Sequence, residues 1–223
     1  MDFTAIDFET ATSVYSSVCS LGICVVENNK IVERREFRIK PTPFVFNDYN
    51  ILIHGIHPED VECEKTFDLL WQEIRPYLEG KTIVAHNAQF DIGALRAVAD
   101  LFGIEYPTFD YLCTVKLSQK AYPELESHKL NFLGNALGIC FNHHEACDDA
   151  YACAEVLLRI LNDFGLDSIQ DIEEKFEIGI GKIYPGYYEP CRKNKKKNAS
   201  KCKKIKSSNP AETRVSDSIL HEI

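Results

Sequence analysis

The sequence predicts an α/β fold in which helices flank a mixed sheet, because strand patterns come first along the chain and then alternate with helix patterns. In the stretch AIDFET, residues 5–10, side chains follow the two-residue period of a β-strand. Residues 18–41 indicate two more strands around a polar turn at residues 27–30, which is a hairpin signal. A helix is predicted within residues 64–78, where apolar side chains recur at helical spacing.

Strand and helix patterns alternate through the rest of the first 165 residues. The expected elements are, in order, a loop leading into a helix (50–61), a strand (81–87), a helix (88–103), a strand (108–117) and two helices (129–138 and 145–165). A glycine closes each of the last three helices, because glycine adopts the left-handed conformation that commonly ends a helix.

Length and composition divide the chain into three parts. We expect a domain over residues 1–166, a short helix with a Gly/Pro/Tyr-rich connector over 167–190, and a basic, disordered tail over 191–223. Residues 1–190 carry a net charge of −16, and the tail carries +7. An acidic body indicates that an anionic substrate is met through metal ions or local basic groups rather than a general positive field.

Some classes of protein are disfavoured by signals that the sequence lacks. It contains no run of 18 apolar residues, so no segment is expected to cross a membrane. The nine cysteines are scattered, odd in number and without a CxxC pair, which disfavours a disulfide framework or a zinc ribbon. We therefore expect reduced thiols and a cytoplasmic protein.

Acidic residues in three predicted elements are the main functional signal. Asp7 and Glu9 project from one face of the first strand, with Cα atoms about 6.5 Å apart, so their carboxylates repel each other. Asp91 starts a helix, where the helix dipole alone would favour a carboxylate. Asp149 lies on the apolar stripe of the helix 145–165, whereas Asp148 lies on its polar face. A carboxylate that faces a core requires a cation or a strong partner, so Asp149 is the informative one.

Two histidines precede that helix, and spacing alone does not choose between them. His143 lies five residues before Asp148, and His144 lies five residues before Asp149. Because the apolar stripe selects Asp149, it selects His144 with it. Divalent cations with oxygen ligands make a carboxylate cluster favourable, and two ions about 3.5–4 Å apart stabilise the attacking and leaving oxygens of phosphodiester hydrolysis. The four acids and His144 therefore indicate a two-metal hydrolase.

Three sequence blocks in order, DFET, HNAQFD and HHEACDDA, resemble the DnaQ-like exonucleases of the DEDDh class, a family that includes the exonuclease domain of the DNA polymerase III epsilon subunit. The family blocks are D-x-E, N-x-x-x-D and H-x-A-x-x-D, and the match covers about residues 1–165. The matching residues are Asp7, Glu9, Asn87, Asp91, His144, Ala146 and Asp149. This resemblance implies a ribonuclease-H-like α/β domain with a mixed five-stranded sheet, and 3′→5′ hydrolysis that releases nucleoside 5′-monophosphates.

The same resemblance implies roles for individual residues. Asp7, Glu9 and Asp149 would ligate two Mg²⁺ or Mn²⁺ ions, and Asp91 would complete the site, partly through water. His144 would be the general base, since an imidazole with an ordinary pKa near 6.5 is mostly neutral at pH 7. Weaker matches give five candidates for substrate binding, which turn formation and loop packing explain equally well: Thr10, His54, Gly55, Ile56 and Asn87.

The expected substrate is the 3′ end of single-stranded nucleic acid, with DNA favoured and a role in proofreading or repair. An RNA-trimming or oligoribonucleotide exonuclease would use the same five residues, so the motifs do not separate the two. A proofreading subunit that mainly docks on a polymerase, and a catalytically silent binding module, are further alternatives. The basic tail suits either a polymerase or nucleic acid as partner, because its charges would release counterions from phosphates.

Overall fold

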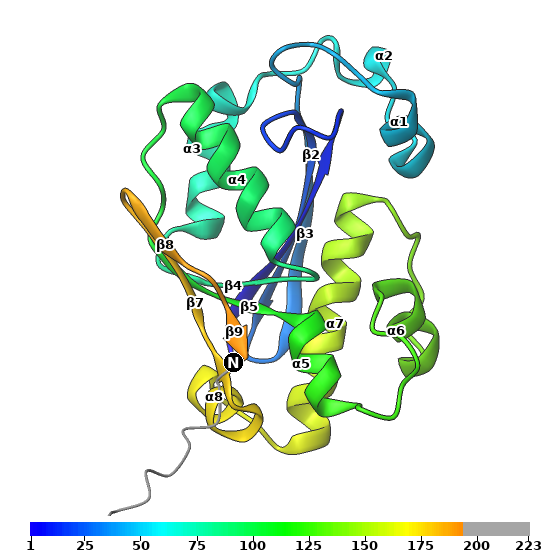
Figure 1. Cartoon of the computed structure of the whole chain (residues 1–223), viewed down its shortest axis with the longest axis vertical. Coiled ribbons are helices and arrows are strands. Elements are labelled where there is room, and N and C mark those ends of the chain that lie inside the picture. The colour runs from blue at the N-terminus through cyan, green and yellow to red at the C-terminus, as the bar shows by residue number, and fades with distance from the viewer. Residues whose placement is uncertain (194–223) are drawn as a thin grey trace, which may run out of the picture.

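A seven-stranded mixed sheet forms the centre of the computed structural model, which describes residues 1–193 (Figure 1). The strand order is β3-β2-β1-β4-β5-β7-β8. The strands are β1 (Phe3–Thr10), β2 (Val18–Glu27), β3 (Lys30–Arg38), β4 (Thr82–Ala85), β5 (Phe109–Cys113), β7 (Gly181–Tyr184) and β8 (Tyr187–Glu189). Strands β1, β4 and β5 are parallel, and the hairpin β2–β3 and the pair β7–β8 run antiparallel to their neighbours. The α/β class and the mixed sheet are confirmed.

The sheet has two strands more than the five that the family resemblance implies, and both come from the segment expected to be a connector. Strand β7 pairs antiparallel with β5, and β8 pairs with β7. Gly181 lies opposite Tyr111, whose ring occupies the space that a side chain at Gly181 would need. The glycines and Pro185 of this segment hide the alternation typical of strands, which is why the pattern was not visible in the sequence.

The C-terminal part of the described chain also contains a helix and a second small sheet. Helix α8 (Ile169–Phe176) is the short helix expected here, and its N-cap Ser168 forms a capping box in which Ser168 and Asp171 bond each other's backbone N–H groups. Strands β6 (Ile178–Gly179) and β9 (Arg192–Lys193) pair with each other. The rest of the predicted basic tail, residues 194–223, lies outside the described residues.

Helices cover both faces of the sheet (Figure 1). Helices α3 (Phe67–Leu78) and α4 (Gln89–Phe102) lie together on one side. On the other side α7 (Ala146–Phe164) packs across β1 and β2, with α5 (Thr114–Ala121) and α6 (Leu130–Leu137) beside it. Two short helices, α1 (Asp48–His54) and α2 (Pro58–Val61), follow the hairpin. The strand expected over 108–117 ends at Cys113, where α5 begins.

The apolar stripe predicted for α7 is the face that the helix buries against the sheet. Its members are less than 2% exposed: Ala146, Ala150, Cys153, Leu157 and Ile160. Asp149 is 4% exposed among them, as the stripe argument requires. The helix therefore carries one carboxylate into the interface between α7 and the strands.

Two expectations from composition can be compared with the described chain. The eight cysteines within residues 1–193 are free thiols, most of them buried. Across these residues, no helix is both long and apolar enough to span a bilayer.

Candidate active site

The acids that the sequence analysis selected meet where β1, α4 and α7 converge. Asp7 and Glu9 come from β1, Asp91 from the first turn of α4 and Asp149 from the first turn of α7. Carboxylate oxygens of Asp7, Glu9 and Asp149 lie within 4.8 Å of one another. Segments up to 142 residues apart in the chain thus bring three acids to one point.

A glycine explains how α7 comes close enough to deliver Asp149. Gly22 on β2 is the direct cross-strand partner of Asp7 on β1. A Cβ atom at Gly22 would lie 1.9 Å from the carbonyl oxygen of Ala146, the first residue of α7. The bare backbone at Gly22 therefore lets the start of α7 lie against the sheet beside Asp7, and any larger residue would push the helix and Asp149 away.

Asp91 differs from the other three acids because it is held by the backbone of β1. Its side chain is 1% exposed, and Oδ1 accepts a hydrogen bond from the Phe8 backbone N–H at 3.0 Å. Its other oxygen, Oδ2, is buried with no hydrogen-bond partner among residues 1–193. A buried carboxylate oxygen without a partner is unfavourable, so a cation or an ordered water beside Oδ2 would stabilise the folded protein.

The pKa of every acid in the cluster is raised, as expected for carboxylates that crowd one another away from water. Burial, followed by the charges of Asp91, Glu9 and Asp149, raises the pKa of Asp7 well above its ordinary value. Burial and the charge of Asp149 raise the pKa of Glu9 to about 8, and burial raises that of Asp91 to about 7. The pKa of Asp149 is also raised by burial, against the opposing hydrogen bonds from His143 and His144.

These residues fit hard divalent cations. Asp7, Glu9 and Asp149 offer carboxylate oxygens, their partial burial disfavours uncompensated charges, and Asp91 offers an unpaired oxygen. Asp7, Glu9 and Asp149 form the close set, whereas Asp91 stands outside it.

The raised pKa values lead to a prediction about stability without and with metal. Between about pH 4 and pH 8 the folded protein keeps protons on these acids that the unfolded chain releases, so the free energy of unfolding of the metal-free protein falls as the pH rises. Metal binding removes that penalty, and it competes with protons. At a concentration about 100 times its Kd at pH 8, Mn²⁺ should raise the melting temperature at pH 8 on the order of 5–10 °C. The same concentration should raise it clearly less at pH 5, where protons compete for the carboxylates.

Thermal unfolding in chelator and in Mn²⁺ at the two pH values measures this difference. Asp167, an exposed acid of the loop before α8, supplies the matched control, since Asp167→Asn should leave the pH-dependent metal effect intact. A metal-induced rise that is equal at pH 5 and pH 8 would contradict a site made of proton-binding carboxylates.

The two histidines lie together on the carboxylate side of α7. Their rings stack with centroids 3.8 Å apart, and ring nitrogens of both lie within reach of Asp149. The closer imidazole is that of His143, whose Nδ1 lies 3.0 Å from Oδ1 of Asp149. His144 bonds the same carboxylate through its backbone N–H, at 2.9 Å, and has a φ of +72°. Spacing along the helix selected His144 and gave no sign of this contact of His143.

Asp148, expected on the polar face of the helix, links α7 to β3 and to the loop before α7. One of its oxygens pairs with the Arg34 guanidinium from β3, and the other accepts the Asn142 backbone N–H at 2.9 Å. Arg34 also lies over the ring of Tyr151, 4.4 Å from its centroid. The loop that carries the two histidines is thus fixed to the sheet at Asn142, the residue before His143. A helical-wheel argument could not find this contact, because Arg34 belongs to a distant strand.

Four of the five candidates for substrate binding form a structural unit at the end of β1. His54, at the end of α1, lies with Nε2 3.3 Å from the Thr10 carbonyl oxygen and accepts the Ile56 backbone N–H on Nδ1 at 3.0 Å. Gly55 has a φ of +68° and ends α1. Ile56 packs in a small apolar cluster with Ala11. These contacts account for all four residues without a ligand.

Asn87 is the candidate that lies with the acids. It lines a cavity of about 680 Å³ together with Asp7, Glu9, Asp149 and both histidines. Its φ of +66° places it in the turn just before α4, and asparagine tolerates that conformation better than most residues. Asn87 therefore lines the same cavity as the acids, and Thr10, His54, Gly55 and Ile56 are not among the residues that line it.

The cavity also has a wall that the sequence analysis did not identify. The loop between α5 and α6 contributes side chains from residues 126–129, among them His128 and Lys129. Lys129 is a basic group beside the acids of an otherwise acidic body. This loop has neither helical nor strand periodicity, so no pattern in the sequence could place it at the site.

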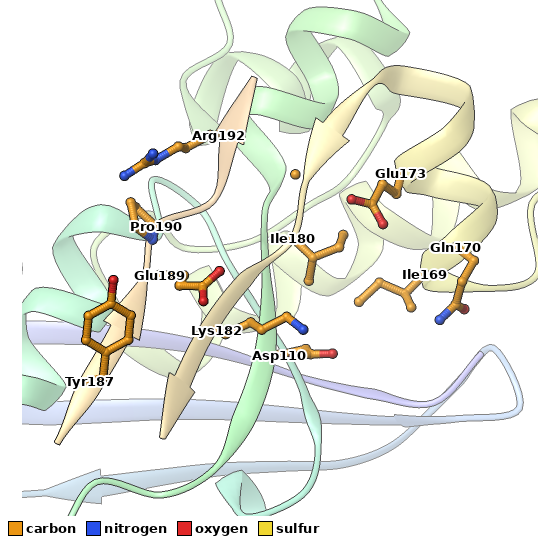
Figure 2. A pocket seen from close by; sticks show the side chains of 11 residues that line it. Asp110, Ile169, Gln170, Glu173, Ile180, Lys182, Tyr187, Glu189, Pro190 and Arg192 are labelled. Carbon is orange, nitrogen blue, oxygen red and sulfur yellow. The ribbon is translucent and has the colours of Figure 1, made fainter. Parts of the chain in front are cut away.

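A separate cavity of about 610 Å³ lies between α8 and the strands β7–β9 (Figure 2). Figure 2 shows Lys182 between Asp110 and Glu189, its neighbours across the sheet. None of the candidate site residues lines this cavity. Its charges are of both signs, and Lys182 is the cross-strand neighbour of both Asp110 and Glu189, so it offers no cluster comparable to that of β1, α4 and α7.

Comparison with known proteins gives one family and consistent relatives. Residues 4–157 match the family model RNase_T, described as Exonuclease. The chain is 25% identical over 196 residues to the PolC-type DNA polymerase III of Caldanaerobacter subterraneus subsp. tengcongensis, covering 84% of this chain and 14% of the relative. It is 30% identical over 163 residues to the 3′-5′ exonuclease DinG of Bacillus subtilis (strain 168), covering 71% of this chain and 17% of the relative. The chain thus spans less than a fifth of the length of these relatives.

Solved structures share the fold. Exonuclease X in complex with 5′ overhanging duplex DNA superimposes with a TM-score of 0.61 at 23% identity, covering 78% of this chain and 96% of that one. The nuclease domain of 3′hExo, a DEDDh family member bound to rAMP, gives a TM-score of 0.63 at 17% identity, covering 73% of this chain and 92% of that one. At these identities the likeness concerns the fold, and the chemistry must be argued from the residues themselves.

Proposed function

Because this chain belongs to the RNase_T exonuclease family, we propose that it is a metal-dependent 3′→5′ exonuclease that releases nucleoside 5′-monophosphates from single-stranded nucleic acid, with DNA favoured. The observation that carries the proposal is the convergence of carboxylate oxygens of Asp7, Glu9 and Asp149 within 4.8 Å, next to Asp91 with its unpaired oxygen. A binding module that performs no chemistry would have no use for such a costly cluster.

In this proposal the acids bind cations, and a histidine accepts a proton. Asp7, Glu9 and Asp149 hold two Mg²⁺ or Mn²⁺ ions, and Asp91 completes the set. Bound ions of this kind supply charge stabilisation and a lowered pKa for water. His144 accepts the proton of the attacking water. Burial, followed by the neighbouring His143, lowers the pKa of His144, so its imidazole is neutral and able to accept a proton at pH 7.

Asn87 and Lys129 would position the strand. Both line the cavity of the acids, and they offer an amide and an ammonium group at its wall. Phosphate oxygens accept hydrogen bonds from such groups. The carboxylates repel a phosphodiester, so these donors and the cations would supply the attraction that the acidic body lacks.

The preference for DNA draws on the similarity to the PolC-type DNA polymerase III. A ribonuclease of the same class remains the second candidate, since a fold neighbour, 3′hExo, carries rAMP. We propose a role in proofreading or repair, and a polymerase as partner, because the chain is similar to part of PolC-type DNA polymerases.

Degradation of matched single strands tests the proposal. We expect a 3′-labelled DNA oligonucleotide to lose mononucleotides in Mg²⁺ or Mn²⁺ and to stay intact in chelator, with the RNA of the same sequence degraded more slowly. Faster loss of RNA would favour the ribonuclease. An oligonucleotide that stays intact with both metals, or internal cleavage, would overturn the proposal.

A further inference from the structure

A second cavity, of about 480 Å³, adjoins the cavity of the acids. The two share Asn87, and the second continues along α4 to β5, β8 and the first turn of α5. Part of its wall is β8, which belongs to the C-terminal addition to the sheet. A strand of nucleic acid that ends at the acids could therefore extend into this second cavity past Asn87.

Basic groups in this second cavity contrast with the charge of the body. Arg96 and Lys116 both line it, in a part of the chain with a net charge of −16. The Nε atom of Arg96 is buried and has no hydrogen-bond partner among residues 1–193. Lys116 donates to the Cys191 carbonyl oxygen. The acid of the cavity, Asp100, already accepts a hydrogen bond from the Tyr106 hydroxyl at 2.6 Å.

Aromatic faces accompany these basic groups. Tyr15 and Tyr188 both line the cavity and are 43% and 37% exposed. The guanidinium of Arg96 lies 3.6 Å from the ring centroid of Tyr188. Tyr15 meets Phe90 edge to face, and its ring occupies the space in front of Gly93 on α4. Exposed aromatic rings beside cations form the type of surface on which single-stranded nucleic acid stacks its bases.

We propose that this second cavity binds a nucleotide unit of the substrate strand on the 5′ side of the bond that is cut. The base stacks on Tyr15 or Tyr188, and the phosphate lies near Arg96. Asn87, which faces both cavities, contacts the backbone between the two units. This inference rests on the proposed exonuclease function and adds to it a binding place for the base next to the cut bond.

Two single strands of equal length test it, one with a base on the unit just 5′ of the cut bond and one with an abasic site there. In the unmodified protein the ratio of kcat/KM between the strand with the base and the abasic strand should be about fivefold or more, because stacking of one base is worth at least that much. Arg96→Gln and Tyr188→Leu should each remove most of this ratio, and Tyr188→Phe should keep it. Arg75→Gln, in an exposed ion pair with Glu79 on α3, is the matched control for the lost charge.

Melting temperatures separate lost binding from lost folding, and Arg96→Lys, which retains the charge, should keep part of the ratio. A ratio that Arg96→Gln and Tyr188→Leu leave unchanged would overturn the inference. Strands that carry 5-iodouracil provide a readout independent of hydrolysis, since light should join them to Tyr15 or Tyr188. If the protein cuts no strand but this link forms, the proposed function fails, and the cavity binds nucleic acid without the role in hydrolysis inferred for it. If the protein cuts strands and the link forms elsewhere, the cavity assignment fails.

Discussion

Replacing Asp7 by asparagine is expected to lower kcat/KM for a 3′-labelled single strand by at least about a thousandfold, since cation-based charge stabilisation is worth several kcal/mol. Asp7 is the acid surrounded by the other three, because the charges of Asp91, Glu9 and Asp149 all act on it. The change keeps the size of the side chain and removes one of the ligand charges. Hydrolysis rates at saturating Mn²⁺ measure the effect.

The same variant should remain folded. In the metal-free protein Asp7→Asn removes a source of repulsion, so its melting temperature at pH 8 should equal or exceed that of the unmodified protein. Asp167→Asn, a change of the same type at an exposed site, should alter neither rate nor melting temperature. Loss of activity together with unfolding would show that Asp7 acts on the fold, and retained activity would contradict its role as a ligand.

Replacing His144 by alanine is expected to lower kcat by about a hundredfold to ten-thousandfold, the usual contribution of general acid–base catalysis. Affinity for Mn²⁺ should change little, because the carboxylates and not the imidazole hold the ions in this proposal. The pH dependence should agree. Since burial and His143 lower the pKa of His144, turnover of the unmodified protein at Mn²⁺ concentrations that saturate the site at each pH should fall as the pH drops through a value below 6.5.

His143 provides a matched control within the same loop. His143→Ala also removes an imidazole, one that lies 3.0 Å from Asp149, and should affect turnover less than His144→Ala does. Comparison of kcat and of the Mn²⁺ affinity for the two variants separates a proton acceptor from a group that positions Asp149. If His143→Ala is the more damaging for kcat, the base has been assigned to the wrong histidine.

Local patterns predicted the elements that carry the acids. The alternation of AIDFET gave β1, and the stripe of α7 gave the burial of Asp149, because both are periodic over many residues. Convergence of the acids was predicted because carboxylates that repel each other or face a core need a shared cation. Gly22 leaves the space that lets α7 bring Asp149 beside β1, yet nothing in the sequence near residue 22 reveals that α7 packs there.

Features made by contacts between distant segments could not be predicted in this way. Strands β7 and β8 are short and contain or flank glycine and proline, so their pairing with β5 depends on the partner strand rather than on their own pattern. The contact of Asp148 with Arg34 joins a helix to β3. The shared position of Asn87 between two cavities likewise becomes visible only when α4, β5 and β8 are placed together.

Counting bound Mn²⁺ by electron paramagnetic resonance tests most directly whether the acids share cations. The unmodified protein should bind two ions per chain with coupled spectra, as expected for ions about 4 Å apart, and Asp7→Asn should lose at least one of them. Binding of the same number of ions by Asp7→Asn, or no binding by the unmodified protein at millimolar Mn²⁺, would contradict a metal centre at β1, α4 and α7.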